Sequence, residues 1–456
     1  MWLVHDLIEF EKAGVATVAI VSKGFIDDTK HSAKAFGMPN LPFAVVPHTI
    51  TSRSLEQIRS DVEPICGELI QGLLVTPPAA QASVSGTGEA VRAISEKFSG
   101  RNMYDAWEAM NETFMERGWG DGFPLVPPTR EKVEATLRAV TKDPLETLGR
   151  LTPGNGLVTI EKLAINSVMA GCKPEHFPVI VTALEAMLNT PETQFPIRTV
   201  SISTGPHFFM LLINGPIVKK LGINSGACSL GPGKPGRVNT VLGRALRLVM
   251  MNVGHCYPGK GDMDTIGTPH KWSFCIAENE DASPWPSFHE ERGFRKDQST
   301  VTVLPAIDVT HVKDYNDKAD ELLNTWACAA ARPTDAAMLA NRVEYGWRHV
   351  FMLICPDHAR ILAEQGYTKR GVREYVAAHS LAPLKWINSE LRNRPEPIAP
   401  QWRWTLTADQ EMRIPVIQDP SHIHMVVIGG QTGKSDYAKL LGQPSKTMEI
   451  TCAAGS

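Results

Sequence analysis

The sequence predicts an α/β protein in which a small, parallel, doubly wound domain is followed by a larger mixed α/β domain. Two observations support this fold class. In residues 1–76, short runs of β-branched residues alternate with helical patterns, and such alternation is typical of a parallel sheet covered by helices. A segment rich in Pro, Ala, Ser and Gly follows, and we expect a linker over residues 77–100. The larger domain then occupies residues 101–450.

The first domain is predicted to contain three helices and two strands in alternating order. A glycine follows each of the first two helices as a C-cap, and a serine precedes the third helix as an N-cap. The strands are short and apolar, as expected for buried parallel strands. We expect helices at residues 2–12, 26–36 and 54–74, and strands at residues 16–21 and 41–46.

The larger domain has a different texture, because long loops rich in Gly, Pro and Asn separate its predicted elements. Ordered loops of this length are usually functional. No internal repeat is visible in the sequence. Helices are predicted at residues 103–117, 129–140, 159–170, 175–189, 236–251, 315–330, 357–365 and 369–379. Strands are predicted at residues 198–203, 208–213, 272–277, 300–304, 349–354 and 422–428. The long loops span residues 118–128, 222–239, 254–271 and 278–293.

The composition narrows the class of protein. The net charge is −3 and no stripe of Lys and Arg is present, which argues against a nucleic-acid partner. No apolar run reaches the roughly 18 residues that a membrane helix needs. The eight cysteines form no Cys-x-x-Cys pair, which argues against a zinc knuckle or a disulfide scaffold. We therefore expect a cytoplasmic protein with neither a nucleic-acid nor a membrane partner.

Two stretches of the first domain resemble a known family. They are Asp6-Leu-Ile-Glu-Phe-Glu-Lys-Ala-Gly-Val-Ala-Thr-Val and Gly37-Met-Pro-Asn-Leu-Pro-Phe-Ala-Val-Val-Pro-His. They resemble the UGSC-motif proteins and, more distantly, component B of glycine, sarcosine and betaine reductase. In these families a strand leads to a Cys/Sec-Gly-Ser/Thr-Cys loop before the first helix. The resemblance implies a Sec or Cys nucleophile that cleaves a carbon–heteroatom bond, but no Cys precedes Trp2 in this sequence.

The C-terminal residues 446–456 end in Cys-Ala-Ala-Gly-Ser after a strand-like run. Placed before Met1, this run puts Cys452 at the family's spacing from Glu9 in the first helix. We expect the tail to complete the first domain, with Cys452 as the nucleophile at the helix N-terminus, where the helix dipole favours a thiolate. His5 would then act as its base. The alternatives are a disordered tail and a histidine on the helix surface.

Parts of the larger domain resemble a partner domain that is encoded with, or fused to, UGSC-type proteins. The matching stretches are Arg117-Gly-Trp-Gly-Asp-Gly-Phe-Pro-Leu-Val-Pro-Pro-Thr, Asn166-Ser-Val-Met-Ala-Gly-Cys-Lys-Pro-Glu and Ser283-Pro-Trp. This resemblance implies no particular activity. The chemistry of the larger domain is therefore inferred from its residues.

Two features of the larger domain suit chemistry on an anionic substrate. Cys172 lies just before a predicted helix, a setting that lowers the pKa of a thiol; the alternative is a buried packing cysteine. Residues 222–236 form a Gly-rich loop that leads into a helix N-terminus, where backbone N–H groups bind anions; the alternative is a structural loop. The candidate substrate-binding residues are Asn166, Asn224, Ser225, Gly226, Arg237 and Asn239.

A group of acidic residues follows the strand predicted at residues 272–277. Glu278 and Glu280 lie at the carboxyl end of this strand, and His289 lies further along the same loop. Carboxylates and histidine in such a place can carry out general acid–base chemistry or hold a cation. The alternative is a solvated turn.

Together these features predict a thiol-dependent enzyme that cleaves a carbon–heteroatom bond in a small anionic organic substrate. The candidate catalytic residues are Cys452, His5, Cys172, Glu278, Glu280 and His289. No cofactor is implied with certainty. A divalent metal is the alternative, in a lyase or hydrolase whose ligands would be Glu278, Glu280, His289 and His207. A third interpretation is a non-catalytic subunit of a larger reductase-like complex. We expect a homo-oligomer or a complex subunit.

Overall fold

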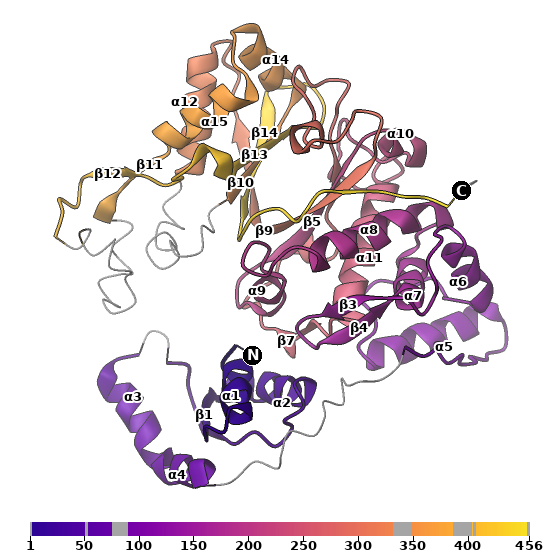
Figure 1. Cartoon of the computed structure of the whole chain (residues 1–456), viewed down its shortest axis with the longest axis vertical. Helices are drawn as coiled ribbons and strands as arrows, with labels where there is room; N and C mark the ends of the chain where they lie inside the picture. Colours follow the sequence, from indigo (N-terminus) through magenta and orange to yellow (C-terminus); the bar gives the residue numbers. More distant parts are fainter. Residues whose placement is uncertain are drawn as a thin grey trace.

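The computed structural model describes residues 2–50, 53–74, 90–331, 349–385, 404 and 407–453. Within these residues a small N-terminal unit precedes a larger unit that is built around one curled sheet (Figure 1). Helices and strands are mixed in the larger unit, which confirms the predicted α/β fold class. No helix in the described part is both long and apolar enough to cross a membrane.

The small unit is built on two parallel strands. Helices α1 and α2 share an apolar core beside β1, and the segment that contains α3 and α4 packs against β2. The helix predicted at residues 54–74 is divided at Glu63–Ile65, because the ring of Pro64 interrupts the helical hydrogen bonds. The elements are α1 (Trp2–Lys12), β1 (Ala19–Ser22), α2 (Ile26–Ala35), β2 (Phe43–Val46), α3 (Leu55–Val62) and α4 (Cys66–Leu74).

The described part of the predicted linker, residues 90–100, has no regular secondary structure and lies along the larger unit. The Arg92 side chain forms an ion pair with Glu161 at 2.7 Å, and the backbone N–H of Ala93 donates to the same carboxylate at 2.8 Å. Glu96 pairs with Arg117 at 2.6 Å. These contacts attach residues 90–100 to the larger unit, while the rest of the predicted linker lies outside the described residues.

The larger unit contains a seven-stranded mixed sheet in the order β13-β10-β14-β9-β5-β8, with β15 paired to β9. Six other short strands of this unit form three two-stranded pairs outside this sheet. The sheet strands are β5 (Phe208–Asn214), β8 (Cys275–Ala277), β9 (Thr300–Lys313), β10 (His349–Ile354), β13 (Ile423–Val427), β14 (Lys434–Leu440) and β15 (Met448–Glu449). The other strands are β3 (Thr147–Leu151), β4 (Gly156–Thr159), β6 (Tyr257–Pro258), β7 (Gly261–Asp262), β11 (Leu381–Pro383) and β12 (Arg413–Pro415).

The sheet consists of two halves with the same topology. In each half a strand (β5 or β10) leads through helices to a parallel edge strand (β8 or β13). The chain then returns as an antiparallel strand on the other side (β9 or β14). The strand ends correspond in sequence, since Phe-Met-Leu-Leu-Ile precedes Asn214 and Phe-Met-Leu-Ile precedes Cys355. The structure therefore contains a topological repeat that the sequence shows at these strand ends but not in the connecting segments, which share no pattern.

The sheet curls until its two edge strands meet at their carboxyl ends. The backbone N–H of Asn279, just after β8, donates to the carbonyl of Val427 in β13 at 2.7 Å. Side chains that face inward from six of the seven strands, all except β15, form one central apolar core, and Phe288 enters this core from the loop after β8. Representative members of the core are Met210, Phe274, Leu304, Phe351, Val426 and Ala438.

Helices cover the outer surface of each half and form a second and a third apolar core. Helices α7, α8 and α11 pack on the first half, and α12, α14 and α15 pack on the second (Figure 1). Their bounds are α7 (Ile160–Ala170), α8 (Phe177–Leu188), α11 (Arg237–Asn252), α12 (Ala319–Ala330), α14 (Pro356–Glu364) and α15 (Lys369–His379). The other α-helices in the described part of the larger unit are α5 (Met103–Glu116), α6 (Arg130–Leu137), α9 (Ile197–Ile202) and α10 (Ile217–Leu221).

The prediction of a strand at residues 198–203 is wrong, because this segment belongs to helix α9. Its β-branched residues favour a strand, but Val200 and Ile202 are buried on the helix, and the Ser201 hydroxyl donates to the carbonyl of Ile197 one turn earlier. Tertiary packing therefore overrides the local preference of this run.

The Gly-Trp-Gly-Asp stretch of residues 118–121 is held against α11 by one ion pair. Both carboxylate oxygens of Asp121 accept hydrogen bonds from Arg244, at 2.7 and 2.8 Å, and the Asp121 side chain is almost completely buried. The Arg244 guanidinium also donates to the carbonyls of Phe123 and Pro124. The Arg244 guanidinium is therefore fully engaged in holding this loop.

The small unit contacts the larger one through helix α2, which lies against β7. The ring of His31 on α2 lies 6.3 Å, between centroids, from the rings of both His255 and Tyr257. His255 stacks on Tyr257. Burial lowers the pKa of His31 and of His255, so both rings are neutral at neutral pH.

Removing the Asp121 carboxylate should destabilise the protein strongly. Asp121→Ala leaves the Arg244 guanidinium partly buried without its partner, and breaking a buried pair costs about 3 kcal/mol or more. Urea unfolding measures the change in free energy. The double variant Asp121→Ala/Arg244→Met should lose clearly less than the sum of the single variants, and strict additivity would show that the pair is not coupled.

Contact between the two units should weaken in acid. The pKa values of His31 and His255 are lowered from 6.5 in the contact, so proton uptake below about pH 6.5 favours separation. Nearby Asp28 opposes this effect and Lys260 adds to it. Hydrogen–deuterium exchange of residues 26–35, after correction for intrinsic rates, should be faster at pH 5.5 than at pH 7.5. His31→Phe should reduce the difference, whereas His48→Phe, at an exposed position, should not.

Candidate active site

The carboxyl ends of four strands meet where the curled sheet closes. We call this region the seam and define it by Asn214, Glu278, Cys355 and Ile428, which lie at or just after the ends of β5, β8, β10 and β13. Besides the Asn279–Val427 hydrogen bond, the N–H of Ile428 donates to the carbonyl of the last residue of β10 at 2.9 Å. Open α/β sheets bind their ligands at the carboxyl ends of strands, so the seam is the first place to look for a site.

Each half also sends a loop across the seam to the other half. After α10, the carbonyl of Ser225 accepts a hydrogen bond at 2.8 Å from the N–H of Gly429, which follows β13. A Cβ at Gly430 would lie 3.0 Å from the Cβ of Ala227, so the two loops are closely packed. After α14, the ammonium of Lys369 reaches to 3.7 Å from the carboxylate of Glu278. The two crossings therefore join the halves on both sides of the seam.

Glu278 is a buried carboxylate with an unusual pKa. Its Oε2 accepts hydrogen bonds from the Asn214 side-chain amide at 2.6 Å and from the backbone N–H of Phe288 at 2.7 Å. Burial raises the pKa of Glu278 to about 7, although Lys369 and the two hydrogen bonds act in the opposite direction. A carboxyl group with a pKa near neutrality can both donate and accept a proton under physiological conditions.

Glu280 and His289 lie beside Glu278, as their positions in the loop after the predicted strand led us to expect. The backbone N–H of Gly215 donates to Glu280 Oε1 at 2.7 Å, and the Asn214 amide reaches the same oxygen at 3.3 Å. His289 Nδ1 lies 3.7 Å from Glu280 Oε1, and its Nε2 donates to the carbonyl of Arg295. The three residues are thus close together, while their catalytic role stays a prediction.

The same geometry does not suit the predicted metal site. The Lys369 ammonium and the Asn214 amide occupy the positions beside the two carboxylates where a cation would bind. His207 precedes β5, at the opposite end of that strand from Asn214. In the described part of the chain, no group of three or more His, Cys, Asp or Glu residues has an arrangement that could hold a metal ion.

On the other side of the seam, Cys355 and His358 form a thiol–imidazole pair. Cys355 follows β10 and is the N-cap residue of α14. His358 Nδ1 lies 2.7 Å from the Ser435 hydroxyl, and its Nε2 donates to the carbonyl of Asp314 at 3.0 Å. The Ser435 oxygen also accepts the N–H of Cys355 at 2.9 Å. These bonds fix the imidazole in one orientation next to the thiol.

The pKa values of the two groups are shifted in opposite directions. Burial raises the pKa of the Cys355 thiol, but hydrogen bonding with the His358 ring and the Ser435 hydroxyl outweighs burial, so the pKa lies below its ordinary value. For His358, burial lowers the pKa, and hydrogen bonding to Cys355 and to the Asp314 carbonyl raises it above the ordinary value. Opposite shifts of this kind are those expected when a histidine activates a neighbouring cysteine.

A strained glycine-rich loop passes the N-terminus of α14. Thr432 has a φ of +139°, a conformation that costs energy for a residue with a side chain, and Gly429 and Gly433 also have positive φ. The N–H of Thr432 donates to the Asp357 carboxylate at 2.6 Å in the first turn of α14. The loop is therefore held beside the Cys355–His358 pair.

Sequence reasoning missed Cys355, although a signal is present. A strand and a helix are predicted on either side of it, and the run Cys-Pro-Asp-His puts a histidine in the first turn of that helix. Ser435 and Asp314 come from distant parts of the chain. Their contribution to the pair could not be deduced without the strand pairing.

Residues 1–75 match the family model described as the UGSC family. The match covers the N-terminal unit alone, which we call the UGSC segment after this similarity. No curated protein and no solved structure matches the chain. The similarity of this segment to the reductase component, and that of the larger unit to a UGSC partner domain, therefore rest on the residues that carry them.

The sequence led us to expect Cys452 in the UGSC segment, but the structure places this residue elsewhere. Its tail pairs through β15 with Val301 of β9, and the N–H of Ala453 donates to the carbonyl of Ala139 after α6. Figure 1 shows the two chain ends on different parts of the molecule. His5 contacts Phe36 and Asp6 on the surface of α1, as in the alternative interpretation.

Cys172 also lacks the expected environment. Its thiol donates to the carbonyl of Val241 at 3.4 Å, and burial raises its pKa far above the ordinary value, although the distant charge of Arg244 lowers it slightly. A thiol in this state is protonated and unreactive at neutral pH. The packing alternative therefore describes Cys172 correctly.

The predicted substrate-binding loop is tied to the sheet by its own amides. The Asn239 side chain donates to the carbonyls of Asn224 and Cys275, and it accepts the N–H of Asn224. Asn224 in turn accepts the N–H of Gly226. These side chains hold the loop in place. The backbone around Ser225 is the part of the loop that lies at the seam. Asn166 lies elsewhere, on α7, and Arg237 begins α11.

Glu278 should make stability depend on pH in a characteristic way. Its pKa in the folded protein, about 7, exceeds the ordinary 4.5, so its contribution is present below pH 4.5 and is lost as the pH rises to 7. The loss is about 3 kcal/mol. Urea unfolding of Glu278→Gln should show a flatter pH dependence between pH 4.5 and 7. Glu364→Gln, an exposed control, should keep the wild-type slope; an unchanged slope in Glu278→Gln would contradict the shifted pKa.

Proposed function

We propose that this protein is a thiol-dependent enzyme that cleaves a carbon–heteroatom bond in a small anionic organic substrate, with Cys355 as its nucleophile. The observation that carries the proposal is the Cys355–His358 pair at the carboxyl end of β10, where the thiol pKa is lowered in spite of burial. The UGSC match of residues 1–75 supports thiol chemistry only as a resemblance to a family motif.

In this proposal the Cys355 thiolate attacks the carbon of the substrate, and the bond from that carbon to the heteroatom breaks. The electron pair of the broken bond goes to the heteroatom, which then takes the proton of the His358 imidazolium. The Asp314 carbonyl and the Ser435 hydroxyl keep the imidazole in position for this transfer. Nucleophiles that are activated by an adjacent histidine follow the same logic in unrelated folds.

Other groups at the seam have supporting roles in the proposal. Backbone N–H groups of the Gly429–Gly433 loop and of the first turn of α14 suit an anionic group of the substrate. Glu278, with a pKa of about 7, is suited to move a second proton across the seam. Because the reaction needs a reduced thiol, the reducing cytoplasm is the fitting location.

We also propose that the protein works as an oligomer or within a complex. Large apolar side chains are exposed on α3 and α4 of the UGSC segment, among them Leu55, Ile70 and Leu74. Large apolar side chains that are exposed on neighbouring helices suit burial against another chain. Size-exclusion chromatography with light scattering gives the mass of the assembly directly.

Cys355 should react with iodoacetamide at a lower pH than an ordinary thiol. Peptide mass mapping from pH 5.5 to 10 gives the carbamidomethylation rate of each cysteine. The rate at Cys355 should rise with a midpoint below 9.0, the ordinary value, because the thiolate forms earlier. His358→Asn removes the imidazolium and should shift this midpoint upward by about one pH unit or more.

The matched control is His311→Asn, which changes an exposed histidine that pairs with Asp436. It should leave the Cys355 profile unchanged. Cys355 is only 2% exposed, so a bulky maleimide should react far more slowly than iodoacetamide. A Cys355 midpoint at or above 9.0, or identical profiles in wild type and His358→Asn, would refute the proposed nucleophile.

A further inference from the structure

The imidazole of His358 is held on its far side by the turn that follows β9. We call residues 314–318, between β9 and α12, the Asp314 turn. The carbonyl of Asp314 lies 3.0 Å from His358 Nε2. A carbonyl oxygen can only accept a hydrogen bond, so Nε2 carries a proton, and Nδ1 is the ring nitrogen that can take the proton of the Cys355 thiol. The position of this carbonyl therefore determines the orientation and the tautomer of the ring.

The carboxylate of Asp314 is itself fixed by two hydrogen bonds. The hydroxyl of Thr325, on α12, donates to Oδ2 at 2.5 Å, and the backbone N–H of Asn316 donates to Oδ1 at 2.8 Å. Burial raises the pKa of Asp314, but these hydrogen bonds outweigh burial and the pKa lies below its ordinary value, so the carboxylate is charged at neutral pH. Because α12 packs on the outer surface of the second half, the side chain ties the carbonyl of the same residue to the framework of that half.

The glycine-rich loop before β14 contacts the same carbonyl. The N–H of Asp314 donates to the carbonyl of Gly433 at 3.2 Å. A Cβ at Gly433 would lie 2.5 Å from the Asp314 carbonyl oxygen, closer than real Cβ atoms approach. Gly433 also has a φ of +57°, a conformation that favours glycine. A side chain at position 433 would therefore displace the carbonyl that holds His358.

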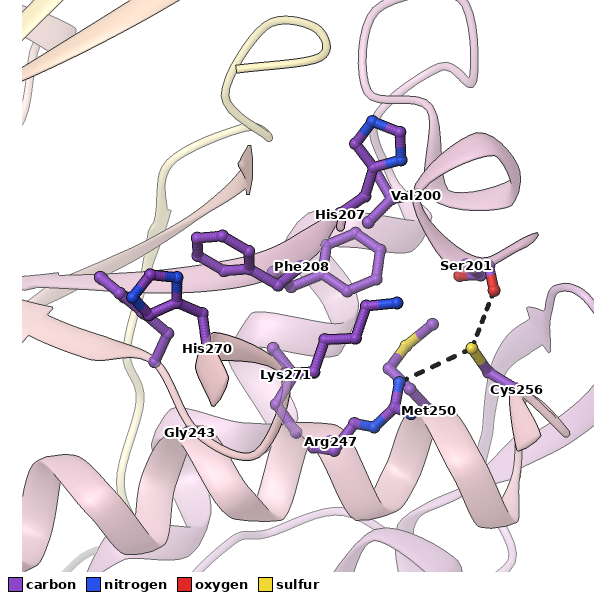
Figure 2. Close-up of a pocket in the computed structure, with 13 residues that line it drawn as sticks. Val200, Ser201, His207, Phe208, Gly243, Arg247, Met250, Cys256, His270 and Lys271 are labelled. Atoms are coloured by element: carbon purple, nitrogen blue, oxygen red, sulfur yellow. Dashed lines mark hydrogen bonds between the residues drawn. The ribbon is translucent and has the colours of Figure 1, made fainter. Parts of the chain in front are cut away.

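A second cysteine shows that a neighbouring cation does not by itself lower a thiol pKa in this protein. Figure 2 shows Cys256 between Arg247 and Ser201, in the lining of a small cavity beside α11. The Arg247 guanidinium donates to its sulfur at 3.7 Å, and the thiol donates to the Ser201 carbonyl at 3.0 Å. Burial nevertheless raises the pKa of Cys256 to about 11, and the charge of Asp262, which binds Arg247 at 3.2 Å, acts in the same direction. At Cys355, by contrast, the neighbour is a ring that can take the thiol proton and whose other nitrogen is already bonded to a carbonyl.

We propose that Asp314 is the positioning residue of the Cys355–His358 pair. Its carbonyl fixes the imidazole, and its carboxylate, held by Thr325, keeps that carbonyl in place. The proton of the Cys355 thiol passes to His358 Nδ1, which gives a thiolate and an imidazolium without a further reactant. A third group that orients the base is a general feature of activated nucleophiles. The role in catalysis rests on the function proposed above, whereas the hold on the ring does not.

The charge of Asp314 acts in the same direction as its carbonyl. Burial lowers the pKa of His358, whereas hydrogen bonds to Cys355 and to the Asp314 carbonyl raise it, as do the charges of the same two residues. Loss of the Asp314 charge should therefore lower the pKa of His358 and raise that of the Cys355 thiol.

Nuclear magnetic resonance of the full chain with ¹⁵N-labelled histidine tests the hold on the ring. The Nε2–H proton of His358 should give a slowly exchanging signal, because the residue is only 1% exposed, and His358→Asn assigns this signal by its loss. Thr325→Val, which keeps the shape of the side chain, should speed the exchange by about tenfold or more, the effect of one hydrogen bond. Thr325→Ser retains the hydroxyl and should restore the wild-type rate.

The matched control is Thr113→Val, which removes the hydroxyl of another helical threonine, in α5, that donates to the carbonyl of Ala109. It should leave the His358 signal unchanged. Equal exchange rates of the His358 Nε2–H in wild type and in Thr325→Val would overturn the proposal.

The pH profile of Cys355 carbamidomethylation is a second readout, which a merely structural role of Asp314 would not move. Asp314→Asn retains the shape of the side chain and removes its charge, so the midpoint should rise by about half a pH unit or more. Thr325→Val should also raise the midpoint, and Thr325→Ser should not. Cys256, whose pKa is raised to about 11, is the internal reference and should react alike in all variants.

The two readouts separate failure of this proposal from failure of the proposed nucleophile. A wild-type midpoint below 9.0 that neither Asp314→Asn nor Thr325→Val moves would overturn the role of Asp314 and retain Cys355 as the nucleophile. A wild-type midpoint at or above 9.0 would refute the nucleophile, and the exchange of the His358 Nε2–H would then decide whether Asp314 holds the ring.

Discussion

The closure of the curled sheet is the constraint on which the other features of the larger unit depend. A single backbone hydrogen bond between Asn279 and Val427 marks the place where the two edge strands meet, and Phe288 fills the space beside it. Backbone N–H and C=O groups at a sheet edge need hydrogen-bond partners when they are buried. Closure gives the edge strands such partners in one another. It also brings together strand ends that lie at opposite edges of the flat strand order. Without closure there would be no seam.

Closure also explains the chemistry of the seam. It excludes water from polar groups that hydrogen bonds hold in the protein interior. Glu278 is held by Asn214 and a backbone N–H, so desolvation acts on its pKa and not on its position. Cys355 experiences the same burial, yet the neighbouring His358 reverses its effect. One half thus provides a carboxyl group whose pKa is raised, and the other provides a thiol whose pKa is lowered. Two topologically equivalent halves have acquired complementary chemistry.

Local pattern was sufficient where a feature depends on neighbours in the sequence. The alternating elements of the small unit and the grouping of Glu278, Glu280 and His289 after one strand are of this kind. Local pattern failed to predict features that depend on which distant strands pair. The tail with Cys452 joins β9 and not α1, and the partners of His358 come from β14 and from the segment after β9. Helix α9 shows the same limit, since packing decided its conformation against a β-branched run.

Strand β9 has a consequence for how the protein folds. It is fourteen residues long; its first part pairs with β5, and its second part pairs with β14. The strand belongs to the first half, and it is also the strand through which the second half joins the sheet. The two halves cannot melt as separate modules, as linked domains usually do. Unfolding of the larger unit should therefore be a single cooperative transition, and a strand pairing far apart in the sequence should set its slow folding rate.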